Sequence, residues 1–184
     1  MSLKATAAAE TQIGLGDFNA PLRVYVANRP PLDEYLYLDE VRLMRKGEIK
    51  KIADLTGNHW RKLFNVYAKF VYELQGESLA AVGVASWQEY RDQSLLQSGS
   101  DLTLLFSKPD LSALEGGALH IVMGKGFALD LGLPPLVWLN EHFAINKEQR
   151  IIVCPYFDYR QLSNVRIKFL VDLIVKEFPQ WSRP

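Results

Sequence analysis

The chain has 184 residues, and its 21 Lys and Arg balance 21 Asp and Glu, so its formal net charge at pH 7 is zero. Apolar residues make up 48% and charged residues 23% of the sequence, fractions typical of a globular domain. This composition excludes disorder, collagen and coiled coil as descriptions of the whole chain, and it disfavours a protein that holds polyanions by bulk charge. The neutrality hides a basic segment at 42–51, which leaves room for a local basic surface.

The length favours a single domain. Residues 1–20 offer little to bury, so we predict a flexible N-terminal tail there and one folded domain over 21–184. The chain shows neither a secretory signal nor the run of about 18 apolar residues that a membrane helix needs. Its one cysteine, Cys154, can form no intramolecular disulfide. We therefore expect a soluble, cytoplasmic protein with no membrane partner.

The first half of the chain predicts one strand and several helices. A β-rich run at 22–27 predicts a strand that two following prolines end. Charged residues between apolar ones predict a helix over 33–46 and a shorter one over 48–55. The clearest helix is 58–75, where six apolar side chains recur at helical spacing and Gly76 marks the end. The small apolar residues at 78–85 predict either a strand or a buried turn.

The middle of the chain alternates between helices and strands. A polar helix is predicted at 86–97, with two aromatic residues facing inward. A short apolar run follows at 102–106. A buried strand is predicted at 118–123, between two glycine pairs, and a short helix follows at 127–131.

The last third predicts one further strand and a terminal helix. An apolar run lies at 136–139, a second buried strand at 150–154, and an amphipathic helix at 161–178. Apolar strands separated by helices are typical of a parallel sheet covered on both faces. The predicted fold class is α/β, a single-domain three-layer sandwich with a mainly parallel central sheet.

Candidate site residues lie just after three of the predicted strands. In open α/β sheets, ligands bind beyond the carboxyl ends of the strands. The loops that follow the strands at 22–27, 118–123 and 150–154 mix glycine or proline with polar and aromatic groups. The residues that we select as ligand-binding candidates are Asn28, Arg29, Asp33, Gly124, Lys125, Gly126, Tyr156, Phe157 and Arg160.

Two of these loops each allow two interpretations. The loop at 124–126 either presents backbone N–H groups and the Lys125 charge to an anion, or is a tight turn between strand and helix. It matches neither the dinucleotide fingerprint nor the P-loop. The aromatic loop at 156–160 either stacks a flat ring and holds its phosphate through Arg160, or packs against its own helix.

Other chemistry has weaker support in the sequence. Cys154 is either a nucleophile with a histidine base or a small buried apolar residue. The three histidines, His59, His120 and His142, have no metal-ligand spacing, so we expect no metal site and no cofactor.

The order of the three loops resembles the uracil-DNA glycosylase superfamily. That family has a strand with a Gly-x-Asp-Pro-Tyr-like loop, a later strand with a Gly-x-x-Ala-like turn, and a last strand ending in His-Pro-Ser. The counterparts here are the segments 24–31, 121–128 and 152–157. No Asp precedes Pro30, and Cys154 stands where the family has its catalytic histidine.

The resemblance implies a protein that binds a nucleobase, a nucleotide or nucleic acid with a degenerate catalytic site. Under this resemblance, Asn28 or Asp33 would stand where the family has its water-activating carboxylate. The chain fits equally well an uncharacterised bacterial family with the same element order. The alternative function is a non-catalytic interaction protein, such as a homodimer that uses exposed aromatic surface at Trp87, Trp138 or Trp181.

Overall fold

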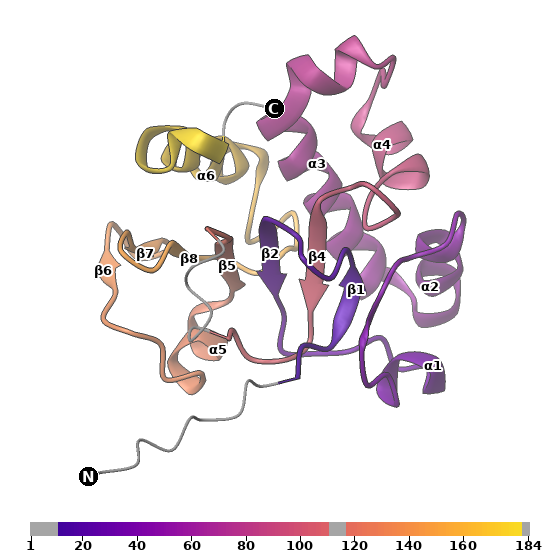
Figure 1. The fold of residues 1–184 in the computed structure, drawn as a ribbon, viewed down its shortest axis with the longest axis horizontal. Helices are drawn as coiled ribbons and strands as arrows, with labels where there is room; N and C mark the ends of the chain where they lie inside the picture. Colours follow the sequence, from indigo (N-terminus) through magenta and orange to yellow (C-terminus); the bar gives the residue numbers. More distant parts are fainter. Residues whose placement is uncertain (1–10, 111–116, 182–184) are drawn as a thin grey trace, which may run out of the picture.

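The computed structural model describes residues 11–110 and 117–181 (Figure 1). Within these ranges, eight strands form one mixed sheet at the centre of the molecule. The strands are β1 (Gly14–Gly16), β2 (Leu22–Tyr25), β3 (Val41–Arg42), β4 (Leu102–Leu105), β5 (Leu119–Met123), β6 (Val137–Trp138), β7 (Ala144–Asn146) and β8 (Ile151–Cys154). The helices are α1 (Asp33–Leu36), α2 (Glu48–Thr56), α3 (Asn58–Ala81), α4 (Trp87–Gln93), α5 (Lys125–Asp130), α6 (Asn164–Glu177) and the 3₁₀ turn η2 (Pro179–Trp181).

Four parallel strands form the middle of the sheet. The full order is β3-β1-β4-β2-β5-β8-β7-β6, in which β4, β2, β5 and β8 run in the same direction. β1 runs antiparallel to β4, and the β6–β7 and β7–β8 pairs are antiparallel as well. Parallel pairs are therefore the majority, and the prediction of an α/β fold with a mainly parallel sheet is confirmed.

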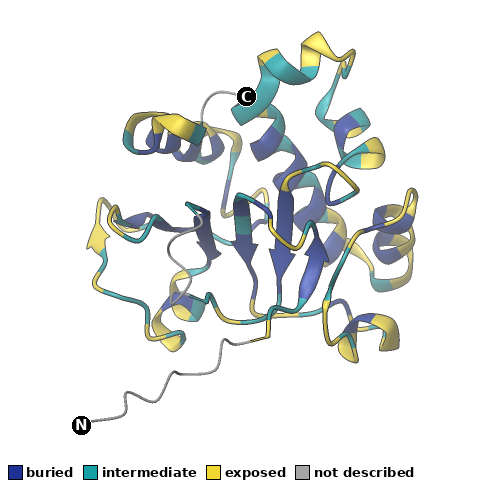
Figure 2. Cartoon of the chain, viewed as in Figure 1, coloured by how far each residue is buried: buried dark blue, intermediate teal, exposed yellow. Residues whose placement is uncertain are grey.

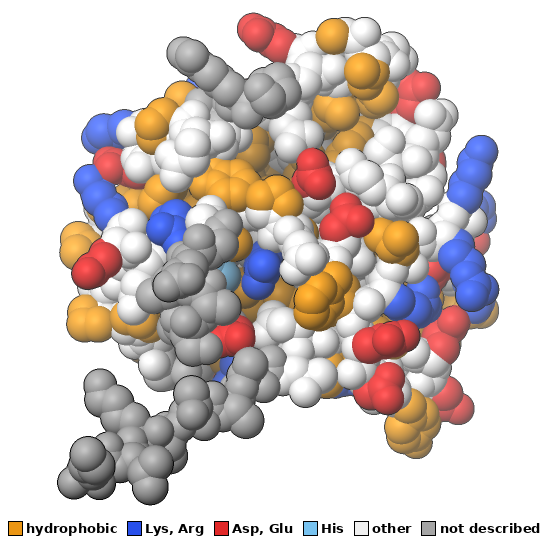
Figure 3. All heavy atoms as spheres, in the orientation of Figure 1, with side chains coloured by type: hydrophobic (Ala, Val, Ile, Leu, Met, Phe, Trp, Pro, Cys, Tyr) orange, Lys and Arg blue, Asp and Glu red, His pale blue; other side chains and the backbone are white. Residues whose placement is uncertain are grey.

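The two faces of the sheet are covered unequally. Buried side chains of α2, α3, α4 and α6 pack on one face, in the larger apolar core. The other face is covered by α5 and the segment after it, around a smaller core that contains Tyr25, Val122 and Val153. Figure 2 shows that the central strands are buried and that the helices expose their outer sides. The cations of the segment 42–51 lie around α2, at the right of the view in Figure 3.

The predicted helix over 33–46 is wrong beyond its first turn. α1 ends at Leu36, and the chain then enters β3, which pairs with β1. The reason is a tertiary contact: the Arg29 guanidinium donates to the backbone carbonyls of Tyr35, Leu36 and Leu38 at 2.9–3.0 Å. These bonds satisfy the carbonyl groups that end a helix, so the short helix ends stably there.

The longest helix, α3, continues to Ala81 instead of ending at Gly76. The strand or turn predicted from residue 78 onward is therefore wrong over 78–81. Leu79 packs against the core from this extension. A glycine inside a helix costs about 1 kcal/mol relative to alanine, and the packing of Leu79 offsets that cost.

Strand β1 lies within the segment that the sequence predicts as a tail. Its sequence is Gly-Leu-Gly, and only Leu15 contributes a side chain to the core. The glycines are required by the close approach of β4, because a Cβ atom on Gly14 would lie 2.2 Å from the carbonyl oxygen of Leu104. The part of the predicted tail at 1–10 lies outside the described residues.

The other predicted elements are confirmed, with ends that shift by a few residues. They correspond to β2, α2, α4, β5, α5, β8 and α6, and β4 and β6 form within the apolar runs at 102–106 and 136–139. Within the described ranges, the helices lack the combination of length and apolar character needed to cross a membrane.

Candidate functional site

The three predicted strand-end loops meet at one place on the sheet. From β2 the chain goes to β4 on one side, and it then returns past β2 to form β5 on the other side. The crossover direction thus reverses between β2 and β5, and open α/β sheets bind ligands at such a point, beyond the carboxyl ends of the strands. A cleft of about 450 Å³ opens there, lined by residues that include Asn28, His59, Gly124, Lys125, Tyr156 and Gln161.

A second hollow of about 240 Å³ adjoins the first. It shares Gly124, Lys125, Tyr156 and Gln161 with the larger hollow and adds Glu141, His142, Arg160 and Arg166. We call the two hollows together the strand-end cleft. The larger one, beside the rings of Tyr156 and His59, is its aromatic half, and the smaller one, with Arg160 and Arg166, is its cationic half.

The aromatic half is organised by a pair of rings. The Tyr156 hydroxyl lies 2.9 Å from Nε2 of His59, and the ring centroids are 5.4 Å apart. Burial, and secondarily the charge of Asp158, raises the pKa of Tyr156 to about 12. The phenol is therefore protonated at neutral pH and can donate to His59. This hydrogen bond links the loop after β8 to the first turn of α3.

The cationic half is organised around Arg166 on α6. Its guanidinium donates to the backbone carbonyl of Gln161 at 2.6 Å and contacts Nε2 of His142 at 2.7 Å. An arginine only donates, so Nε2 of His142 accepts in this contact. The Glu141 carboxylate lies 3.1 Å from the same Nε2. On the opposite side, the Lys125 ammonium lies 4.6 Å from the ring centre of Trp138.

Gly124 shapes the turn between the two halves. Its φ of +101° lies in a region that side chains with a Cβ atom disfavour, although a Cβ atom there would meet no neighbour within 4 Å. Its N–H donates to the carbonyl of Cys154 at 2.8 Å, and its own carbonyl accepts from Ala128 at the start of α5. Glycine is therefore needed at this position for the backbone conformation of the turn and not for lack of space. The turn holds Lys125 at the edge of the cleft.

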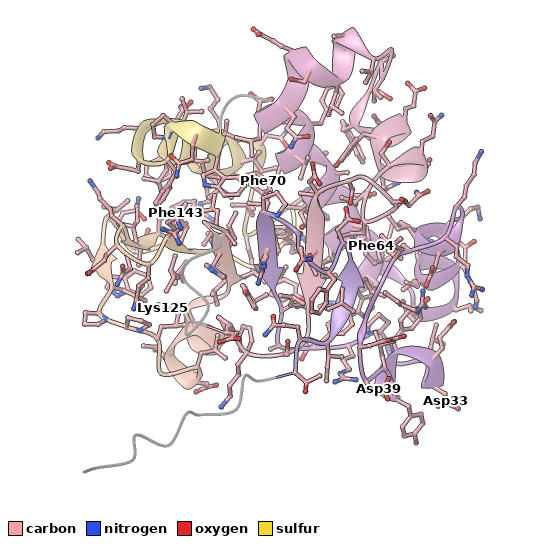
Figure 4. All side chains as sticks on the ribbon, viewed as in Figure 1. Asp33, Asp39, Phe64, Phe70, Lys125 and Phe143 are labelled. Atoms are coloured by element: carbon pink, nitrogen blue, oxygen red, sulfur yellow. The ribbon has the colours of Figure 1, made fainter. Side chains whose placement is uncertain are left out.

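Six of the nine candidate residues line the strand-end cleft: Asn28, Gly124, Lys125, Gly126, Tyr156 and Arg160. Phe157 does not, because it is fully buried between the rings of Tyr67 and Phe70. Arg29 is engaged with the carbonyls around α1. Asp33 is exposed on α1, across the sheet from Lys125 (Figure 4).

Sequence reasoning did not select His59, His142 or Arg166 as ligand-binding residues. His59 lies on the outer side of the helix whose apolar stripe begins at Trp60, and Arg166 lies on the partly exposed side of α6. In the sequence, both His59 and Arg166 look like ordinary solvated helix residues. The signals of the three strand-end loops pointed to this region, but they gave no information about which helices come close.

Cys154 and His120 are both buried, although Cys154 belongs to the lining of the smaller hollow. Burial raises the pKa of the Cys154 thiol well above its usual range. The Tyr25 hydroxyl lies 2.7 Å from Nδ1 of His120. Burial, followed by the nearby positive charge of Arg23, lowers the pKa of His120 to about 4. The interpretation of Cys154 as a small buried residue is confirmed. In the described ranges, no three His, Cys, Asp or Glu side chains come together as metal ligands.

Another cavity, of about 460 Å³, lies among α2, α3 and α4. It is as large as the aromatic half, but its charged walls pair with one another: Asp54 with Lys50 and Arg61, and Asp92 with Arg91. Of these pairs, Asp54–Arg61 joins α2 to α3, and the other two each lie within one helix, away from the strand ends. The strand-end cleft is therefore the better candidate site, because its polar side chains come from loops at the crossover reversal.

No curated protein and no solved structure matches the chain. The resemblance to the uracil-DNA glycosylase superfamily therefore stays a prediction. One family model matches residues 13–175, which is most of the chain and includes all three strand-end loops. The prediction of an uncharacterised family is confirmed, and the chain belongs to DUF6942, a family of unknown function.

Proposed function

We propose that this protein binds a nucleobase, a nucleotide or nucleic acid in the strand-end cleft. The observation that carries the proposal is the convergence of the loops after β2, β5 and β8 on one cleft beside the rings of Tyr156 and His59. Aromatic side chains stack flat heterocyclic rings, and such stacking contributes about 1–3 kcal/mol per base. A half-buried tyrosine ring beside an exposed histidine ring at a crossover reversal suits a planar ligand.

Two side-chain amides supply polar contacts for the ligand. Asn28 lies on one wall of the aromatic half and Gln161 on another. An amide carries both a donor and an acceptor, as does the edge of a nucleobase. Neither amide is ionised, so these two contacts do not require a charge on the ring.

The proposed fold relationship is a glycosylase-like three-layer sandwich with a degenerate catalytic site. Asn28 carries no carboxylate to activate water, and the buried Cys154 thiol cannot act as a base in place of histidine. We therefore expect binding without cleavage of a glycosidic bond. The single unpaired cysteine fits a cytoplasmic setting for this binding.

Isothermal titration calorimetry with nucleobases, nucleosides, nucleotides and single-stranded oligomers tests the proposal. We expect at least one class to bind, and Tyr156→Ala to weaken that binding by about tenfold, since tenfold corresponds to about 1.4 kcal/mol. Tyr37→Ala is the matched control, because Tyr37 is 81% exposed beside α1. Absence of binding across the whole panel, or equal affinities for both variants, would refute the proposal.

A second candidate is a homodimer through the β6 edge of the sheet. β6 has a sheet neighbour on only one side, and its Val137 and Trp138 are 65% and 37% exposed. Edge strands with apolar side chains pair readily with another chain. Light scattering after size exclusion tests this candidate: a dimer that Val137→Lys disrupts supports it, and a monomer at high concentration rules it out.

A further inference from the structure

We infer that the cationic half of the strand-end cleft is a phosphate subsite, so that the ligand is a nucleoside phosphate. This inference rests on the proposed function and narrows it. The base would stack in the aromatic half, and its 5′-phosphate would lie between Lys125, Arg160 and Arg166. The sequence did not point to Arg166, and the structure assigns it the central position.

The balance of charge in the cationic half favours an anion. Its walls carry three cations, Lys125, Arg160 and Arg166, and one carboxylate, Glu141. Glu141 is 82% exposed, so its side chain is free to turn toward water. The three cations against one carboxylate therefore leave the lining with a surplus of positive charge.

The nearby carboxylate of Asp158 does not cancel this surplus. It accepts the backbone N–H of Arg160 at 2.9 Å and pairs with the Lys62 ammonium at 3.4 Å. Its charge is thus matched by a cation outside the cleft, and the Arg160 guanidinium lies near the Tyr159 ring instead. The guanidinium remains available to a ligand.

Arg166 is held in place before a ligand arrives. Its bonds to the Gln161 carbonyl and to Nε2 of His142 fix the guanidinium at the wall of the hollow. A guanidinium has more N–H donors than these two bonds use, and its planar fork matches two oxygens of a phosphate. A side chain that is already fixed loses little conformational entropy on binding.

The arrangement of the two halves fits one small molecule. Gln161 belongs to both, because it lines the two hollows and its backbone carbonyl holds Arg166. The aromatic half, of about 450 Å³, is larger than the cationic half, of about 240 Å³, as a nucleoside is larger than its phosphate group. The cations are concentrated in one hollow, which suits a terminal phosphate better than a row of phosphates along a strand.

Calorimetry with matched ligands tests the inference. The probes are the four ribonucleosides, their 5′-monophosphates and 5′-diphosphates, inorganic phosphate, and a single-stranded oligomer without terminal phosphates. We expect a nucleoside phosphate to bind at least tenfold more tightly than its nucleoside. Arg166→Gln should remove most of that advantage and leave the nucleoside affinity within about twofold.

Two further variants make the result independent of the stability of Arg166→Gln. Lys125→Gln changes an exposed cation of the same hollow and should act in the same direction, whereas Lys147→Gln changes an exposed cation that pairs with Glu177 outside the cleft and should have no effect. Equal affinities for nucleoside and nucleotide, or tightest binding of the oligomer, would overturn the phosphate subsite and leave the proposed function standing. Absence of binding by every probe overturns both.

Discussion

Replacement of Glu48 by glutamine tests how one buried carboxylate joins three elements. Glu48 is 7% exposed at the start of α2. Its carboxylate accepts from the Tyr35 hydroxyl at 2.7 Å, from the Arg42 guanidinium at 2.6 and 3.2 Å, and from the Arg45 backbone N–H at 2.7 Å. It therefore binds α1, β3 and the turn before α2 to one another.

The expected loss in the free energy of unfolding follows from these contacts. Glu48→Gln keeps the size of the side chain but removes its charge, and it turns an N–H₂ group toward donors that need an acceptor. Hydrogen bonds to charged groups contribute about 1.5–3 kcal/mol each, and the loss of one partner of a buried ion pair costs about 3–5 kcal/mol. Arg42 is 26% exposed and regains some hydration in the variant, so we expect a loss of about 2–4 kcal/mol.

The same carboxylate predicts a dependence on pH. Burial alone would raise the pKa of Glu48, but its bonds with Arg42, Arg45 and Tyr35 together lower it. A carboxylate whose pKa is lower in the folded state stabilises the fold above the ordinary glutamate pKa of about 4.3, and this contribution disappears as the pH falls through the folded value. The gap between the wild type and Glu48→Gln should therefore narrow below pH 4.

Urea denaturation followed by circular dichroism measures both effects. The control is Asp54→Asn, which removes an exposed carboxylate of the same helix, and its unfolding midpoint should not change. A loss below about 1 kcal/mol at pH 7, outside the range expected for a charged hydrogen bond, would refute the reasoning. A gap of constant size from pH 7 to pH 3 would refute it equally.

Further predictions concern glycine, histidine and cysteine positions. Gly14→Ala should lower the free energy of unfolding by about 1–3 kcal/mol through its clash with β4. Gly76→Ala, in open space on α3, should raise it by about 0.5–1 kcal/mol. Equal effects of the two substitutions in thermal denaturation would contradict this. Because the pKa of His120 is about 4, the unfolded chain takes up a proton below pH 6.5 that the folded chain does not, and stability should fall by up to about 3 kcal/mol toward pH 4. His120→Asn should flatten that part of a pH series of urea titrations, and parallel curves would speak against it. Cys154 should react with a thiol reagent only in denaturant, and rapid labelling of the native protein would show that the thiol is accessible.

The long elements of this fold could be predicted because their signals are local. The apolar stripe of α3 recurs at helical spacing within a single segment, and β5 and β8 are continuous apolar runs between turn residues. Such patterns arise from burial on one face or on both, so they can be recognised without knowledge of the partner elements.

The short strands could not be predicted because they depend on their neighbours. β1 is Gly-Leu-Gly, a sequence with low strand propensity, and it exists because β4 leaves room for only a bare backbone beside it. β3 lies in a segment with helical spacing, and it becomes a strand because Arg29 ends α1 early and β1 offers an edge. In both cases a tertiary contact overrides the local preference.

The candidate site was predictable at the level of loops and less so at the level of side chains. A parallel sheet brings the carboxyl ends of its strands to one edge, so the meeting of the loops at Asn28, Lys125 and Tyr156 follows from the predicted topology. Which of two adjacent aromatic residues faces the cleft does not follow, and Phe157 turns into the core. His59 and Arg166 come from helices whose positions the sequence does not specify.

The sheet register has a consequence for how the protein is made. Leu22 pairs with Leu102 and with Leu119, so the first central strand has no neighbour until much of the chain has been synthesised. At about 5–20 residues per second, roughly 80 residues of delay correspond to about 4–16 s. The contacts among α2, α3 and α4 are local by comparison and can form during that interval. We expect the helices to form first on the ribosome, while β2 remains a target for chaperones.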